Sequence, residues 1–131
     1  MTVGLLDTSV IIDWDDPVVA AALPDEAAVS AITLAELAAG PHLALTGHES
    51  ARRQTRLQET EATFEPLPFD VAAARSYGQV VAAVAEVGRT HRRRMADLLI
   101  AATAHANGLP LYTRNSGDFT GLGDLIEVIG I

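Results

Sequence analysis

Lysine is absent from this chain, and so is cysteine. Without cysteine the chain can form neither a disulfide framework nor a thiolate metal site, and an intracellular setting is the simplest expectation. Without lysine it has no side-chain amine to act as a nucleophile or as a phosphate clamp. All nine formal positive charges of the side chains are therefore arginines.

Long hydrophobic runs are also missing. No apolar run approaches the roughly 20 residues that cross a membrane, and the start of the chain lacks the basic region of a signal peptide. We therefore expect a soluble cytoplasmic protein with no membrane partner. Its 131 residues, 49% of them hydrophobic and 20% charged, suit one compact domain spanning residues 1–131.

Positive charge is scarce overall but clustered. Seventeen acidic residues against nine arginines give a net charge of −8, which is the wrong sign for holding nucleic acid by overall charge. Seven of the arginines form two groups, at positions 52, 53 and 56 and at positions 89, 92, 93 and 94. Any contact with nucleic acid must therefore be local.

Short apolar runs alternate with helical segments along the chain. We expect strands at residues 3–6, 27–30, 109–113 and 125–129, and helices beginning near residues 8, 17, 33, 47, 70 and 95. This alternation predicts an α/β fold: a single domain with a mainly parallel central sheet flanked by helices.

Four acidic residues occur where predicted strands end or predicted helices begin: Asp7, Glu36, Asp97 and Asp118. The carboxyl edge of a parallel sheet is where ligands bind, so all four could face one cleft. Carboxylates packed together repel one another unless a cation offsets their charge. Oxygen ligands without cysteine favour Mg²⁺ or Mn²⁺ over zinc. Metals held in this way activate water and stabilise charge on phosphoryl oxygens, so the pattern indicates phosphodiester hydrolysis.

Three of these acids also have a structural interpretation. The Thr33-x-x-Glu36 spacing is that of a capping box, in which Glu36 bonds back to the backbone of Thr33. Asp97 suits the first turn of an apolar helix that ends at Asn107-Gly108, and Asp118 suits a loop cap. Taken one at a time, these interpretations compete with a shared site.

Four segments carry a family resemblance. They are Leu5-Leu6-Asp7-Thr8-Ser9-Val10-Ile11-Ile12, Leu34-Ala35-Glu36-Leu37, Ala96-Asp97-Leu98-Leu99-Ile100-Ala101-Ala102-Thr103-Ala104 and Thr113-Arg114-Asn115-Ser116-Gly117-Asp118-Phe119. In this order they resemble the signature segments of PIN-domain ribonucleases, and most closely those of the VapC-type toxins of type II toxin–antitoxin pairs.

The resemblance implies a metal-dependent endoribonuclease with a single PIN-like domain. Asp7 and Asp97 would be the principal Mg²⁺ ligands, with Mn²⁺ as a possible substitute, and Glu36 and Asp118 would complete the acidic site. Water activated by the metal would attack an RNA phosphodiester in line with the leaving 3′ oxygen. The resemblance also implies a VapB-like antitoxin, whose tail lies in an apolar groove and reaches the acidic cleft, and a homodimer or a toxin–antitoxin hetero-oligomer.

Two further sets of residues are candidates for contacts with these partners. Contacts with RNA or the antitoxin are expected from Arg92, Arg93, Arg94 and Arg114. The candidate groove lining is Trp14, Leu34, Leu37, Leu43 and Leu45, although core packing explains most of these equally well. His91, in the basic loop, is expected to face solvent instead of acting as a base.

Two other functions compete with the nuclease. A phosphoacceptor receiver domain also gathers acids at strand ends, but receiver domains carry a lysine near the last strand, and this chain has none. A catalytically silent PIN-like module that only binds RNA or protein is the alternative. The acidic quartet argues against that module, because a pure binding surface has no reason to gather four acids that repel one another.

Overall fold

The computed structural model describes residues 1–90 and 92–131, apart from the side chain of Arg93. Its centre is a sheet of four short strands, β1 (Val3–Leu6), β2 (Glu26–Val29), β3 (Leu111–Thr113) and β4 (Val128–Gly130), in the order β2-β1-β3-β4. Each pairing is parallel. The predicted α/β fold with a parallel sheet is therefore confirmed.

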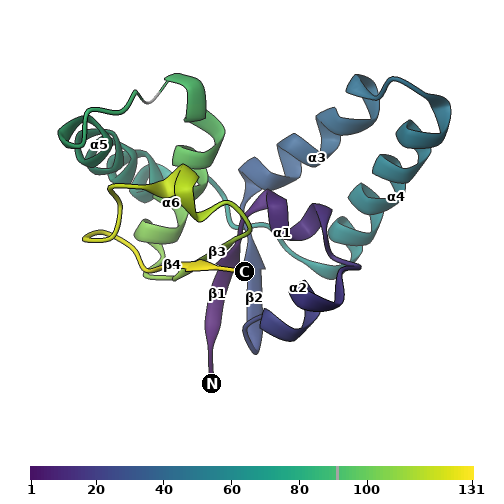
Figure 1. The fold of residues 1–131 in the computed structure, drawn as a ribbon, viewed down its shortest axis with the longest axis horizontal. Coiled ribbons are helices and arrows are strands. Elements are labelled where there is room, and N and C mark those ends of the chain that lie inside the picture. The colour runs from purple at the N-terminus through teal and green to yellow at the C-terminus, as the bar shows by residue number, and fades with distance from the viewer. Residues whose placement is uncertain (91) are drawn as a thin grey trace.

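Six α-helices surround this sheet. Their bounds are α1 (Thr8–Ile12), α2 (Pro17–Ala22), α3 (Ala31–Leu43), α4 (Gly47–Thr63), α5 (Val71–Glu86) and α6 (Met95–Ala106), with short 3-10 segments η1 (Arg92–Arg94) and η2 (Ser116–Phe119). The α3–α4 hairpin projects to one side of the sheet, and α5 and α6 pack together on the other (Figure 1). Among the described residues, no helix is both long and apolar enough to span a bilayer.

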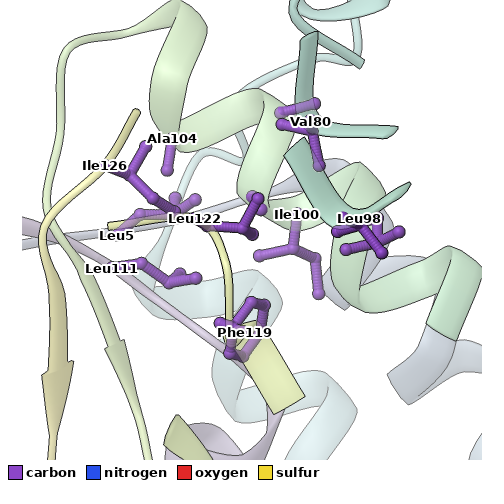
Figure 2. Close-up of a cluster of buried hydrophobic side chains, with 12 residues drawn as sticks. Leu5, Val80, Leu98, Ile100, Ala104, Leu111, Phe119, Leu122 and Ile126 are labelled. Carbon is purple, nitrogen blue, oxygen red and sulfur yellow. The ribbon is translucent and has the colours of Figure 1, made fainter. Parts of the chain in front are cut away.

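Helix α6 is buried on nearly every side. It ends at Asn107, and Gly108 follows with a φ of +63°, a left-handed conformation that glycine adopts without strain. Figure 2 shows Ile100 of this helix lying near Leu111 of the sheet and Leu122 of the C-terminal segment. This packing fixes the first turn of α6, and with it Asp97, relative to the carboxyl edge of the sheet.

A second apolar cluster lies among α1, α2, α3 and the sheet. Its buried members are Leu6, Val10, Ile11, Val19, Val29, Leu37, Leu57 and Tyr112. Trp14 packs against this cluster and meets Phe64 edge to face, with ring centroids 6.1 Å apart. The two clusters together clamp β1 and β3, whose carboxyl ends carry the candidate site.

Two expected element boundaries are wrong. Helix α3 begins at Ala31, because the Ser30 hydroxyl caps it by accepting a hydrogen bond from the Thr33 amide at 3.1 Å. Thr33 is therefore inside the helix, and Glu36 lies in the second turn instead of in a capping box. The last strand begins at Val128, because residues 122–126 form a turn in which the Ile126 amide bonds to the Leu122 carbonyl.

Candidate functional site

Asp7 lies where β1 gives way to α1, and it is 97% buried. Its Oδ1 caps α1 by accepting the Thr8 amide at 2.8 Å. Its Oδ2 accepts the hydroxyls of Ser9 at 2.9 Å and of Thr113 at 2.7 Å. Because β1 and β3 are neighbours, the end of β3 brings Thr113 directly beside Asp7. These bonds fix the orientation of a carboxylate that would otherwise be costly to bury.

Glu36 reaches the same edge from α3. The Thr8 hydroxyl donates to Glu36 Oε1 at 2.6 Å and lies 3.0 Å from the Thr33 hydroxyl. Since Thr8 directly follows Asp7, this bond ties the carboxylate of α3 to the end of β1. Glu36 is exposed, and its bond with Thr8 is a contact that a capping box would not explain.

Asp97 is half-buried in the first turn of α6, as the sequence predicts. Burial raises the pKa of its carboxyl group to about 6, and the negative charges of Asp7, Asp118 and Glu36 add to this shift. The nearby Arg94 guanidinium acts in the opposite direction. The structure therefore brings the four predicted acids together around one point, where their charges oppose ionisation of Asp97.

Asp118 lies in η2, after β3, and forms an ion pair with Arg94. Arg94 Nη1 donates to Asp118 Oδ1, and both side chains are about one-third exposed, at 32% and 38%. Arg94 is also the residue immediately before α6, so it stands between the helix that carries Asp97 and the segment that carries Asp118. Among the side chains that the structure describes, Asp118 is the one of the four acids that pairs with a cation.

The carboxylates surround a site without converging tightly. Among the described residues, no three histidine, aspartate or glutamate side chains are close enough to hold a metal ion as they stand. Glu36 bonds to Thr8 and Asp118 bonds to Arg94, which draws these two acids toward partners of their own.

The donor set nevertheless fits a hard divalent cation. All four groups offer carboxylate oxygens, the ligands preferred by Mg²⁺. Asp7 Oδ1 accepts one hydrogen bond, and a carboxylate oxygen has a second lone pair available. The raised pKa of Asp97 also reports negative charge at this point that Arg94 offsets only in part.

The four arginines predicted to contact partners have different surroundings. Arg114 Nη1 lies 2.8 Å from Asp16 Oδ2 and 3.3 Å from Asp13 Oδ2, so its charge is shared between two acids. Hydrogen bonds from Arg114 and from the Val18 amide lower the pKa of Asp16. Arg92 is exposed in η1. The side chain of Arg93, like the whole of His91, lies outside the described residues.

A groove of about 630 Å³ runs between α1, α3 and α4 and opens beside Glu36. Its lining is largely charged: Thr8, Ile12, Asp13, Asp15, Asp16, Glu36, Leu37, Gly40, Glu49, Arg52, Arg53 and Arg56. Of the apolar residues expected to line a groove, only Leu37 does so. Leu43 and Leu45 are exposed near the tip of the α3–α4 hairpin, and Trp14 borders a separate small cavity. Of the five predicted lining residues, this groove therefore contains Leu37 alone, and the apolar groove expected for an antitoxin tail stays a prediction.

Three hydroxyl residues at the site were not identified as functional from the sequence. Thr8, Ser9 and Thr113 donate hydrogen bonds to the carboxylates of Glu36 and Asp7. The sequence did contain a signal for these residues, because Thr8 and Ser9 directly follow Asp7 and Thr113 ends a predicted strand. Such hydroxyls orient carboxylates without altering the charge of the site.

Comparison with known proteins agrees with this architecture. The profile of the PIN domain matches residues 4–123. Ribonuclease VapC5 from Mycobacterium tuberculosis is 40% identical over 121 residues, covering 91% of this chain and 87% of that protein. Toxin FitB from Neisseria gonorrhoeae is 32% identical over 132 aligned positions, covering 88% and 89%. The crystal structure of VapBC-5, a toxin–antitoxin system of M. tuberculosis, superposes with a TM-score of 0.86 and 38% identity over all of both chains. The chain belongs to the PIN-domain family.

Proposed function

We propose that this chain is a VapC-type toxin, an endoribonuclease that hydrolyses RNA phosphodiester bonds and is neutralised by a cognate antitoxin. The whole of residues 1–131 acts as one ribonuclease domain, and its RNA substrate places it in the cytoplasm. The relatives described above are named as ribonucleases and toxins, and the VapBC-5 structure is a toxin–antitoxin system.

The observation that carries this proposal is the raised pKa of the Asp97 carboxyl group, next to three other acids. A carboxyl group whose pKa rises to about 6 because of burial and of three neighbouring acids lies in a site with unbalanced negative charge. Perturbed carboxylates of this kind cluster at functional sites. A pure binding surface would gain nothing from this repulsion, whereas a cation bound among the carboxylates would offset it.

Each acid has a role in this mechanism. Asp7 and Asp97 would hold Mg²⁺, or Mn²⁺ in its place, and Glu36 and Asp118 would complete the acidic site. When bound, the cation would supply an activated water and offset charge on the phosphoryl oxygens. Ser9 and Thr113 hold the Asp7 carboxylate in a fixed orientation through their hydroxyl hydrogen bonds. Hydrolysis leaves a 5′-phosphate on one fragment and a 3′-hydroxyl on the other.

The antitoxin would neutralise the nuclease from the groove beside Glu36. This groove has acidic side chains on the α1–α2 side and arginines on α4, so a segment that carries both signs of charge would pair with its walls. The groove reaches Glu36, and a tail that fills it would also obstruct RNA. Assembly as a homodimer or as a toxin–antitoxin hetero-oligomer is part of the same proposal.

The test is cleavage of total RNA by the purified, antitoxin-free chain in Mg²⁺, in Mn²⁺ and in a chelator. We expect discrete fragments that require metal. Asp97→Asn should lower cleavage by at least about a hundredfold, because it removes a charged ligand while the volume of the side chain stays nearly the same. Mapping of the fragment ends identifies the target and checks for the 5′-phosphate.

Asp124→Asn is the matched control, because Asp124 is exposed and lies outside the acidic cluster. We expect it to cleave at the parent rate. Cleavage by Asp97→Asn at the parent rate would refute the metal assignment. If the folded parent binds RNA without cutting any of it in either metal, the alternative of a catalytically silent binding module would replace the nuclease.

A further inference from the structure

The four carboxylates create a difficulty for a nuclease, because its substrate is also an anion. One divalent cation offsets only half the charge of four ionised carboxylates, so a phosphodiester approaching the site still meets net negative charge. The chain as a whole, at −8, gives no compensating attraction. A positive group of the chain itself must therefore stand near the acids.

Arg94 meets this requirement among the side chains that the structure describes. Its guanidinium pairs with Asp118 and lies close enough to Asp97 to lower the pKa of that carboxyl group. Its side chain is 32% exposed, so it borders both the acids and solvent. Its place at the start of α6 fixes its backbone relative to Asp97, three residues farther along.

Other arginines near this edge are already engaged elsewhere. Arg114 is held by Asp16 and Asp13 on the α1–α2 side of the site. Arg89 donates to the carbonyl oxygen of Gly117 at 2.9 Å. Arg94 is also engaged, but its partner is one of the four acids.

We propose that Arg94 binds the scissile phosphate of RNA, and that its ion pair with Asp118 holds it in place until the substrate arrives. This inference rests on the proposed nuclease function and extends it to a residue outside the acidic quartet. The planar guanidinium presents several donors, so it can contact a phosphate oxygen without leaving Asp118 completely. Once Asp118 turns toward a bound cation, more of the positive charge of Arg94 becomes available to the phosphate.

The test measures binding of a labelled, mixed-sequence single-stranded RNA in EDTA at low ionic strength, where no metal supports cleavage. The Asp118→Asn background is used, because there Arg94 has no ion pair to lose. Adding Arg94→Gln to this background should weaken RNA binding roughly tenfold, as expected for one charge-assisted hydrogen bond. It should also make the slope of log affinity against log salt less negative by about 0.7.

Arg75→Gln in the same background is the control, because Arg75 is exposed on α5 and the substitution changes the net charge equally. We expect it to change RNA affinity much less than Arg94→Gln. Equal effects of the two substitutions, on affinity and on salt slope, would overturn the proposal even if the parent protein cleaves RNA. Failure of the parent to cleave RNA in any metal would instead refute the nuclease function itself.

A purely structural role for the ion pair predicts a different pattern. In that case Arg94→Gln and Asp118→Asn would each weaken RNA binding in the otherwise unaltered chain, because each breaks the same contact. The phosphate role predicts opposite signs: Arg94→Gln weakens binding, and Asp118→Asn strengthens it. Unchanged RNA affinity in Arg94→Gln, combined with weaker binding of the antitoxin, would assign Arg94 to the protein partner and overturn the proposal.

Discussion

Ionisation of Asp97 destabilises the folded state. Its pKa is about 6 in the folded chain, against an ordinary value of 3.8, because burial and three acids disfavour the ionised form. Between these two values the folded state binds more protons than the unfolded state, so the contribution of Asp97 to stability falls as pH rises through this window. Above about pH 6 the loss is complete. A catalytic site that opposes folding in this way is a recognised compromise.

Asp97→Asn should therefore stabilise the metal-free protein at neutral pH, although it abolishes cleavage. Asparagine has nearly the same volume and no charge to repel its neighbours. We expect the melting temperature of the variant in EDTA to exceed that of the parent at about pH 7.5, and the excess to shrink toward about pH 4. Thermal unfolding at several pH values, with Asp124→Asn as the control, measures this difference. An excess that is independent of pH would contradict the raised pKa.

The sequence predicted the charged residues of the site better than its neutral ones. Asp7 and Asp97 were identifiable because each follows or begins an apolar segment that has to be buried. The hydroxyls of Thr8 and Thr113 were not identified, because serine and threonine occur throughout a chain and only the pairing of β1 with β3 shows that Thr113 reaches Asp7. The pairing of Arg94 with Asp118 depends on the path of the loop before α6, which no local pattern determines.

Among the elements, α3 shows how two good local signals can compete. Ser30 and Thr33 are both suitable caps, and the Thr33-x-x-Glu36 spacing favours the later start. The Ser30 position prevails because β2 ends at Val29 and the isolated bridge between Ser30 and Leu67 fixes the backbone there. The starts of α1, α2 and α5 were predictable within a few residues, because an aspartate caps each of them. Helix α4 is capped by Thr46, and α6 begins without a side-chain cap.

This correction has a measurable consequence for stability. Ser30→Ala removes the hydroxyl that caps the Thr33 amide, and we expect it to lower the free energy of unfolding by about 1 kcal/mol. Ser30→Gly should cost only a few tenths of that amount, because glycine is tolerated at a helix start. Glu36→Ala removes the side chain that a capping box would need, and it should leave the Ser30 cap intact. Urea denaturation of the three variants distinguishes the Ser30 cap from the capping box, which would make Glu36 the sensitive position.

For the molecule as a whole, a bound cation should stabilise the folded state. A ligand at a hundred times its dissociation constant raises the free energy of unfolding by about 2.7 kcal/mol when it binds only the folded state. We expect Mg²⁺ to raise the urea midpoint of the parent by this route at neutral pH and to have little effect on Asp97→Asn. Equal shifts in parent and variant would mean that the cation binds away from the acidic cluster.

The pairing of β1 with β3 also governs when the site can exist during protein synthesis. Asp7 and Thr113 are 106 residues apart in the chain, yet one hydrogen bond joins them, and the strands that carry them are direct neighbours. Contacts so distant in sequence form only after both strands have been synthesised. A nascent chain still attached to its ribosome before Thr113 emerges has Asp7 but lacks the second strand that orients it. The topology thus delays assembly of the acidic site until the chain has been synthesised at least through Thr113.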